Sequence, residues 1–124
     1  MPILTLSCCG ALPASDKHDL GQLLTKLSAQ HLGKTLEVTV VRFFDNTVFH
    51  NGREVSSEGQ FSLEIRVTQG TNTKSQISSF QRSAHDEVAK YLHAEDAVNY
   101  VTVEEVAAAN WGYHGMSQEA RAYI

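Results

Sequence analysis

The sequence predicts an α+β fold in which duplicated β-α-β units place two helices on one face of a four-stranded mixed sheet, with an inserted hairpin. Three observations support this prediction. Residues 2–8 and 61–68 alternate along the chain as half-buried strands do. Residues 15–32 and 73–92 repeat apolar side chains at helical spacing. A further β-prone segment follows each helical one, so the order β-α-β occurs twice.

The first unit begins with PILTLSC, in which Leu4 and Leu6 share one side with Pro2. GALPAS interrupts the strand. We expect the helix to start at Ser15, a suitable N-cap, and to end before Gly33, which favours a helix terminus. The apolar positions of this helix are Leu20, Leu23, Leu24, Leu27 and Leu32.

The second strand and the hairpin follow. Residues 36–44 (LEVTVVRFF) are rich in β-branched and aromatic side chains, which predicts a strand. In TVFHNGREV, the pair Asn51-Gly52 predicts a two-residue hairpin turn, because both positions tolerate positive φ.

The second unit opens with the alternating strand FSLEIRVT. Thr73 and Gln76 have the spacing of a capping box, which predicts the start of the second helix. VNYVTV, residues 98–103, supplies the last long strand. The helix carries its apolar side chains at Ile77, Phe80, Ala84, Val88, Tyr91 and Leu92.

Both apolar helices would cover the same face of the sheet. Its other face, built from Thr- and Val-rich strands, then needs a partner, so we expect oligomerisation.

The 124 residues suit one domain, residues 1–124, with pseudo-repeats at about 2–56 and 57–124. A net charge of −4 argues against a general nucleic-acid binder. No apolar run approaches the roughly 20 residues of a membrane span, and no basic segment precedes an apolar one as in a signal peptide. We therefore expect neither a nucleic-acid nor a membrane partner.

The cysteines and histidines indicate a reducing compartment and no metal site. Cys8 and Cys9 would point to opposite faces of a strand, which disfavours a mutual disulfide, so we expect a cytoplasmic location. The six histidines show no zinc-like pairing.

Pro2 stands at the first position of a strand, where the missing N–H of proline is tolerated. That structural role is one interpretation. The other is chemical: if Met1 is removed, Pro2 becomes a chain-terminal secondary amine, a base and nucleophile that no side chain can supply.

Pro2, the duplicated β-α-β units and the stretch AAANWGYHG together resemble the tautomerase superfamily across nearly the whole chain. That superfamily includes 4-oxalocrotonate tautomerase, macrophage migration inhibitory factor, malonate semialdehyde decarboxylase and the chloroacrylate dehalogenases. The resemblance implies removal of Met1, a catalytic Pro2 and no cofactor. It also implies a homotrimer in which each pocket takes residues from a neighbouring copy.

The resemblance suggests further site residues. Tyr100 falls at the position of a pocket tyrosine, and Lys34 at that of a lysine that meets the substrate carboxylate. Trp111 and Tyr113 correspond to an aromatic pair that lines the pocket, and Glu37 lies near an acidic residue of the decarboxylase. Each also has a structural interpretation: a core or interface aromatic, a lysine at a helix end, or a solvated glutamate.

The sequence also departs from the family. Thr68 and Thr71 stand where the dehalogenases and the decarboxylase carry arginines, and Arg66, on the same strand face as Thr68, could partly replace that charge. No glutamate near Trp111 matches the one that activates water, so we do not expect hydrolytic dehalogenation. His31 resembles a dehalogenase histidine, or it is a helix-end residue.

The first functional hypothesis is a cofactor-free tautomerase acting on a small 2-oxo acid. Pro2 would transfer the proton, Lys34 or Arg66 would bind the substrate carboxylate, and Tyr100 would polarise the carbonyl. One alternative is a hydratase or decarboxylase of a small 3-oxo acid with a cationic Pro2. The other is a non-catalytic oligomer of the same fold.

Overall fold

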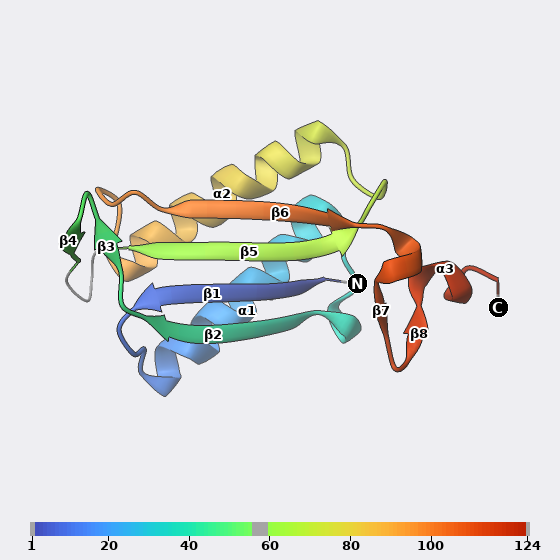
Figure 1. Ribbon diagram of the computed structural model, residues 1–124, viewed down its shortest axis with the longest axis horizontal. Coiled ribbons are helices and arrows are strands. Elements are labelled where there is room, and N and C mark those ends of the chain that lie inside the picture. Colours follow the sequence, from blue (N-terminus) through green and yellow to red (C-terminus); the bar gives the residue numbers. More distant parts are fainter. Residues whose placement is uncertain (1, 56–59, 124) are drawn as a thin grey trace.

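The computed structural model describes residues 2–55 and 60–123 (Figure 1). The long elements form two layers: the four long strands form one layer, and the two long helices lie behind them. The elements are β1 (Ile3–Cys9), α1 (Ala14–Leu32), β2 (Val40–Asn46), β3 (Phe49–His50), β4 (Arg53–Glu54), β5 (Phe61–Thr68), α2 (Lys74–Leu92), β6 (Tyr100–Val106), β7 (Gly112–Tyr113), β8 (Met116–Ser117) and α3 (Gln118–Arg121).

The four long strands are ordered β2-β1-β5-β6. Each β-α-β unit contributes a parallel pair, β1 with β2 and β5 with β6, and the two units join through the antiparallel pair β1 and β5. This confirms the predicted mixed sheet with both helices on one face. The predicted boundary between the pseudo-repeats, at residues 56 and 57, lies outside the described residues.

The core lies between the sheet and the helices. Alternate residues of β5 are buried, beginning with Phe61, and Leu4 and Leu6 of β1 meet them. Burying a leucine or phenylalanine side chain stabilises a fold by about 1.5–3 kcal/mol. The helices contribute Leu20, Leu24, Leu27, Leu32, Phe80, Ala84, Val88 and Ala89 to this core.

The two helices begin differently. At α2 the predicted capping box is confirmed: Gln76 N–H donates to Thr73 Oγ1 at 3.1 Å, and Thr73 N–H donates to the Gln76 side chain at 2.9 Å. The prediction of Ser15 as the N-cap of α1 was wrong, because Pro13 holds that position without a side-chain cap. Pro13 serves there because its carbonyl accepts from Lys17 N–H at 3.1 Å.

The predicted strand over residues 36–44 was wrong in its first part. Leu36–Val38 forms a turn of 3₁₀ helix, and β2 starts at Val40, whose N–H donates to the Pro2 carbonyl at 3.3 Å. Before that point β1 offers no described partner, so the chain bonds to itself: Thr39 Oγ1 donates to the Thr35 carbonyl at 2.7 Å.

Residues with positive φ form the hairpin turn and the C-terminal end of α1. Asn51 and Gly52 have φ of 54° and 74°, which confirms the predicted hairpin between β3 and β4. Gly33 ends α1 with φ of 67°, also as predicted.

After β6 the chain leaves the sheet and forms a short arm, residues 107–123, that contains β7, β8 and α3 (Figure 1). We call this segment the C-terminal arm. It lies beyond the end of the sheet at which β1 begins. Among the helices of the described chain, none is both long enough and apolar enough to cross a membrane.

Candidate active site

Pro2 lies at the start of β1 with its side chain fully buried. Its carbonyl accepts the Val40 N–H at 3.3 Å, which ties Pro2 to the start of β2, at the end of the sheet where β1 also begins. Ile3 pairs with Arg66, so Pro2 is level with Val67 in the antiparallel neighbour. By strand alternation Pro2 shares the helix-covered side of the sheet with Leu4.

Lys34 reaches this same edge from the end of α1. It follows the left-handed Gly33, and its backbone N–H donates to the Ser28 carbonyl at 3.3 Å. Its side chain is only 9% exposed, and Nζ donates to Thr71 Oγ1 at 3.0 Å. Burial lowers the pKa of Lys34 below its usual 10.5, and the Glu105 carboxylate opposes that shift.

The loop from β5 to α2 holds Lys34 in place. Thr71 Oγ1 donates its own proton to the Thr68 carbonyl at 2.6 Å, so only its lone pairs face Lys34. Asn72 Nδ2 donates to the Leu32 carbonyl at 2.9 Å and ties this loop to α1. Thr68, Thr71 and Asn72 of this loop therefore hold the buried lysine against the end of α1.

Acidic and backbone groups complete the edge. Gly70 N–H donates to Glu105 Oε2 at 3.2 Å, and Gln69 N–H donates to the Val106 carbonyl at 2.8 Å. The ends of β5 and β6 are thus closed together beside Lys34. A lysine has three N–H donors, and in the described chain Nζ makes one hydrogen bond and no ion pair.

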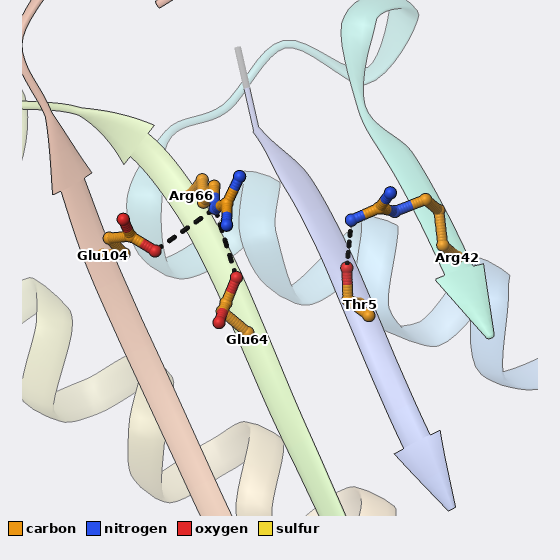
Figure 2. Close-up of polar contacts among 5 residues, drawn as sticks. All are labelled: Thr5, Arg42, Glu64, Arg66 and Glu104. Atoms are coloured by element: carbon orange, nitrogen blue, oxygen red, sulfur yellow. Dashed lines mark hydrogen bonds and ion pairs between the residues drawn. The ribbon is translucent and has the colours of Figure 1, made fainter. Parts of the chain in front are cut away.

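Arg66 lies on the other face of the sheet. Its Nε is 3.2 Å from Glu64 Oε1 and 3.2 Å from Glu104 Oε2, and all three side chains are about half exposed (Figure 2). Pro2 shares the opposite face with Leu4, so one chain does not bring Arg66 to the Lys34 cluster.

Tyr100 lies at the far end of the sheet from Pro2. It pairs with Ser62, which pairs with Ser7 of β1, five residues along β1 from Pro2, or about 17 Å. Its side chain is 61% exposed and, with Thr102, lines a shallow hollow of about 290 Å³ on the open face. Within one chain Tyr100 does not approach Pro2.

Glu37 and His31 are also outside the cluster. Glu37 is exposed in the 3₁₀ turn between α1 and β2. The His31 ring lies in the last turn of α1, with Nδ1 3.0 Å from Ser79 Oγ on α2, so it bridges the two helices.

Trp111 and Tyr113 are half-buried in the C-terminal arm. The Trp111 carbonyl accepts the Gln118 N–H at 2.7 Å. The guanidinium of Arg121 lies 3.8 Å from the centre of the Tyr113 ring, and its Nη2 donates to the Tyr113 carbonyl at 2.7 Å. Sequence reasoning missed Arg121, because nothing local links it to a tyrosine eight residues earlier.

A hollow of the described surface lies away from Pro2 and Lys34. It is an open groove of about 990 Å³ along α1, where Lys17, Gly21, Thr25 and Leu36 are among its lining residues. Among the described residues, no three His, Cys, Asp or Glu side chains are grouped so that they could hold a metal ion.

Comparison with known proteins identifies the fold. No protein-family model and no curated protein matches the sequence. Many solved structures are similar to it. A protein described as the F6 fused 4-OT wild-type asymmetric trimer is 16% identical, with a TM-score of 0.85, over 96% of this chain and 98% of its own.

The second is Pt0534 inactivated by 2-oxo-3-pentynoate, 18% identical with a TM-score of 0.86, over 96% of this chain and 98% of its own. The third is N1, a member of the cis-3-chloroacrylic acid dehalogenase family, 19% identical with a TM-score of 0.81, over 93% of this chain and 82% of its own. The chain therefore has the fold of the tautomerase superfamily, as its sequence predicted.

Proposed function

We propose that this chain is a member of the tautomerase superfamily and a cofactor-independent isomerase. Its substrate would be a small 2-oxo acid that undergoes keto–enol proton transfer. The observation that carries this proposal is that Pro2 and Lys34 are both buried and belong to the same end of a tautomerase-type sheet.

Pro2 would act as the general base after removal of Met1. A chain-terminal amine has an ordinary pKa of about 7.7–8, and apolar surroundings and a nearby cation disfavour its protonated form. A neutral amine can remove a proton α to a carbonyl and return it to another carbon, which completes the tautomerisation.

Lys34 would bind the substrate carboxylate. Its Nζ donates one N–H to Thr71, so its other N–H groups are available to a carboxylate. Partial burial strengthens that charge-assisted interaction relative to one in water. In this proposal Arg66, held by two carboxylates on the open face, is not the main binding group.

The remaining site residues are assigned to an assembled homotrimer. One similar structure is described as a fused 4-OT trimer. The distance along the sheet between Tyr100 and Pro2 favours a site in which Tyr100 polarises the carbonyl of a substrate bound by a neighbouring copy. Trp111 and Tyr113 of the arm would line the site, with Glu37 near its entrance. The free thiols of Cys8 and Cys9 fit a cytoplasmic location.

The test is a proton-transfer assay with phenylenolpyruvate, on protein whose intact mass shows loss of Met1. Turnover that Pro2→Ala abolishes would support the tautomerase. Absence of turnover in the wild type would overturn it, and a 3-oxo acid consumed in a Pro2-dependent manner would favour the hydratase or decarboxylase.

A second measurement uses 2-oxo-3-pentynoate, the compound that inactivates Pt0534. The Pro2 nitrogen would add to the alkyne carbon β to the ketone carbonyl, and the amine proton would pass to the α carbon. The adduct then carries the mass of one whole reagent molecule. We expect this adduct on the first peptide of the wild type and not on Pro2→Ala.

A further inference from the structure

The uncovered face of the sheet carries opposite charges on its two sides. Strand register puts Arg42, Thr5 and Glu64 in one row across the sheet, and Arg66 and Glu104 in the neighbouring row (Figure 2). Because the strand order is β2-β1-β5-β6, Arg42 belongs to one edge strand and Glu104 to the other.

The β5–β6 side has a surplus of negative charge. Arg66 is the cation between Glu64 and Glu104, and the same Nε atom is 3.2 Å from each carboxylate. Two carboxylates and one guanidinium give this side a formal net charge of about −1.

On the open face, the β2 side carries the positive charge of Arg42, whereas Asp45 of the same strand alternates to the other face. Arg42 Nη2 donates to the neutral Thr5 hydroxyl at 2.9 Å, and its guanidinium carbon lies 5.6 Å from the centre of the Phe44 ring. Within residues 2–55 and 60–123, no carboxylate is within ion-pair distance of Arg42. Its charge is therefore held in place but not neutralised.

Opposite charges at opposite edges suit a head-to-tail contact between copies. If two copies met through like edges, Arg42 would face Arg42 or Glu104 would face Glu104, and such pairs repel. When the β2 edge of one copy meets the β6 edge of the next, the charges attract, and a contact of this kind gives a ring where the rotation between copies closes. Exposed Phe44 at 48% and Tyr100 at 61% add apolar surface at these edges.

We propose that the open face and its edges form a head-to-tail interface in which Arg42 of one copy pairs with Glu104 of the next. This inference rests on the proposed homotrimer and specifies the contact that orders it. The complementary charges select the direction of assembly, and the surrounding apolar surface provides the buried area.

The test compares the oligomeric state of four proteins by sedimentation velocity. The wild type should be a trimer. Arg42→Glu should dissociate at a protein concentration at least about tenfold higher, because it places like charges together. The double variant Arg42→Glu/Glu104→Arg should recover at least part of the trimer. Arg82→Glu, the same charge change on the exposed surface of α2, should behave as the wild type.

The outcomes separate this inference from the proposed enzyme. If Arg42→Glu leaves the trimer as stable as Arg82→Glu does, the Arg42 contact is overturned but the trimer itself is not. A monomeric wild type would overturn both statements on assembly, while the Pro2 assay still decides the chemistry. If Arg42→Glu does not fold by circular dichroism, salt replaces it: wild-type trimer must weaken toward about 1 M salt, where the Debye length is about 3 Å.

Discussion

Lys34 Nζ donates a 3.0 Å hydrogen bond to Thr71 Oγ1, and that hydroxyl donates to the Thr68 carbonyl at 2.6 Å. The hydroxyl proton is thus committed to the backbone, so Thr71 can only accept from Lys34. The loop between β5 and α2 therefore positions the buried Lys34 ammonium group through one neutral acceptor, the Thr71 hydroxyl. This relationship makes Thr71 a positioning residue for the proposed carboxylate-binding lysine.

Thr71→Val should weaken the use of substrate in the phenylenolpyruvate assay. Valine keeps the shape of threonine but removes the acceptor, so Lys34 loses its fixed direction. We expect kcat/KM to fall about tenfold, mainly through a higher KM, because hydrogen bonds to charged groups contribute about 1.5–3 kcal/mol. Thr71→Ser keeps the hydroxyl and should retain most of the activity. Equal losses in both variants would contradict this role.

Lys34 should also give the stability of the fold a specific pH dependence. Burial lowers its pKa below the 10.5 of an ordinary lysine, so the unfolded chain binds this proton more tightly than the folded chain. The cost of burying the charged lysine is fully present below the lowered pKa, and it disappears as the pH rises from there to 10.5.

Urea unfolding of wild type and Lys34→Met measures this dependence. The free energy of unfolding of the wild type should rise relative to that of Lys34→Met as the pH increases from 7 towards 10.5. Lys26→Met, which changes an exposed lysine on α1, should run parallel to the wild type. Parallel curves for Lys34→Met would show that the lysine titrates normally in the fold.

Tyr91 links the two helices and should ionise late. Its hydroxyl donates to Asp16 Oδ1 and Asp19 Oδ2, both at 3.0 Å. Loss of solvent, and then these two hydrogen bonds, raise the pKa of Tyr91 to about 12. An ultraviolet titration of tyrosinate should therefore differ between wild type and Tyr91→Phe by one step near pH 12. Asp19→Asn should lower the pH of that step; an unchanged step would exclude the carboxylate contact as a cause.

Local signals in the sequence predicted the elements whose stability is local. The Asn51-Gly52 turn, the Thr73 and Gln76 capping box and the Gly33 terminus were all predicted correctly, because neighbouring residues determine each of them. The strand expected at Leu36 failed for a tertiary reason, since β2 can pair only where β1 supplies partners.

The candidate site depended more on tertiary contacts than on motifs. The contact that holds the buried Lys34 joins it to Thr71, 37 positions away in the sequence, and hydrophobic periodicity does not predict such a pair. The sequence correctly placed Arg66 and Thr68 on one strand face, but not the two carboxylates that hold Arg66. Arg121 was missed for the same reason, since its contact with Tyr113 forms only when the arm folds back.

The turn between β7 and β8 provides a test of the C-terminal arm. A Cβ atom at Gly112 would clash with the Met116 carbonyl oxygen, which is backbone and cannot move aside without breaking the β7–β8 pairing. Gly115 differs, because a Cβ there meets nothing within 4 Å, although its φ of 76° is unfavourable for alanine. Only Gly112→Ala should therefore separate the two strands.

Trp111 is the single tryptophan of the chain, so its fluorescence reports on the arm alone. Gly112→Ala should shift its emission to longer wavelength and increase its quenching by acrylamide, because the adjacent strand pair opens to water. Gly115→Ala should cost about 1 kcal/mol of backbone strain and leave the emission close to that of the wild type. If Trp111 and Tyr113 line the site, Gly112→Ala should also lower kcat/KM more than Gly115→Ala; a shifted emission with unchanged activity would remove the arm from the proposed site.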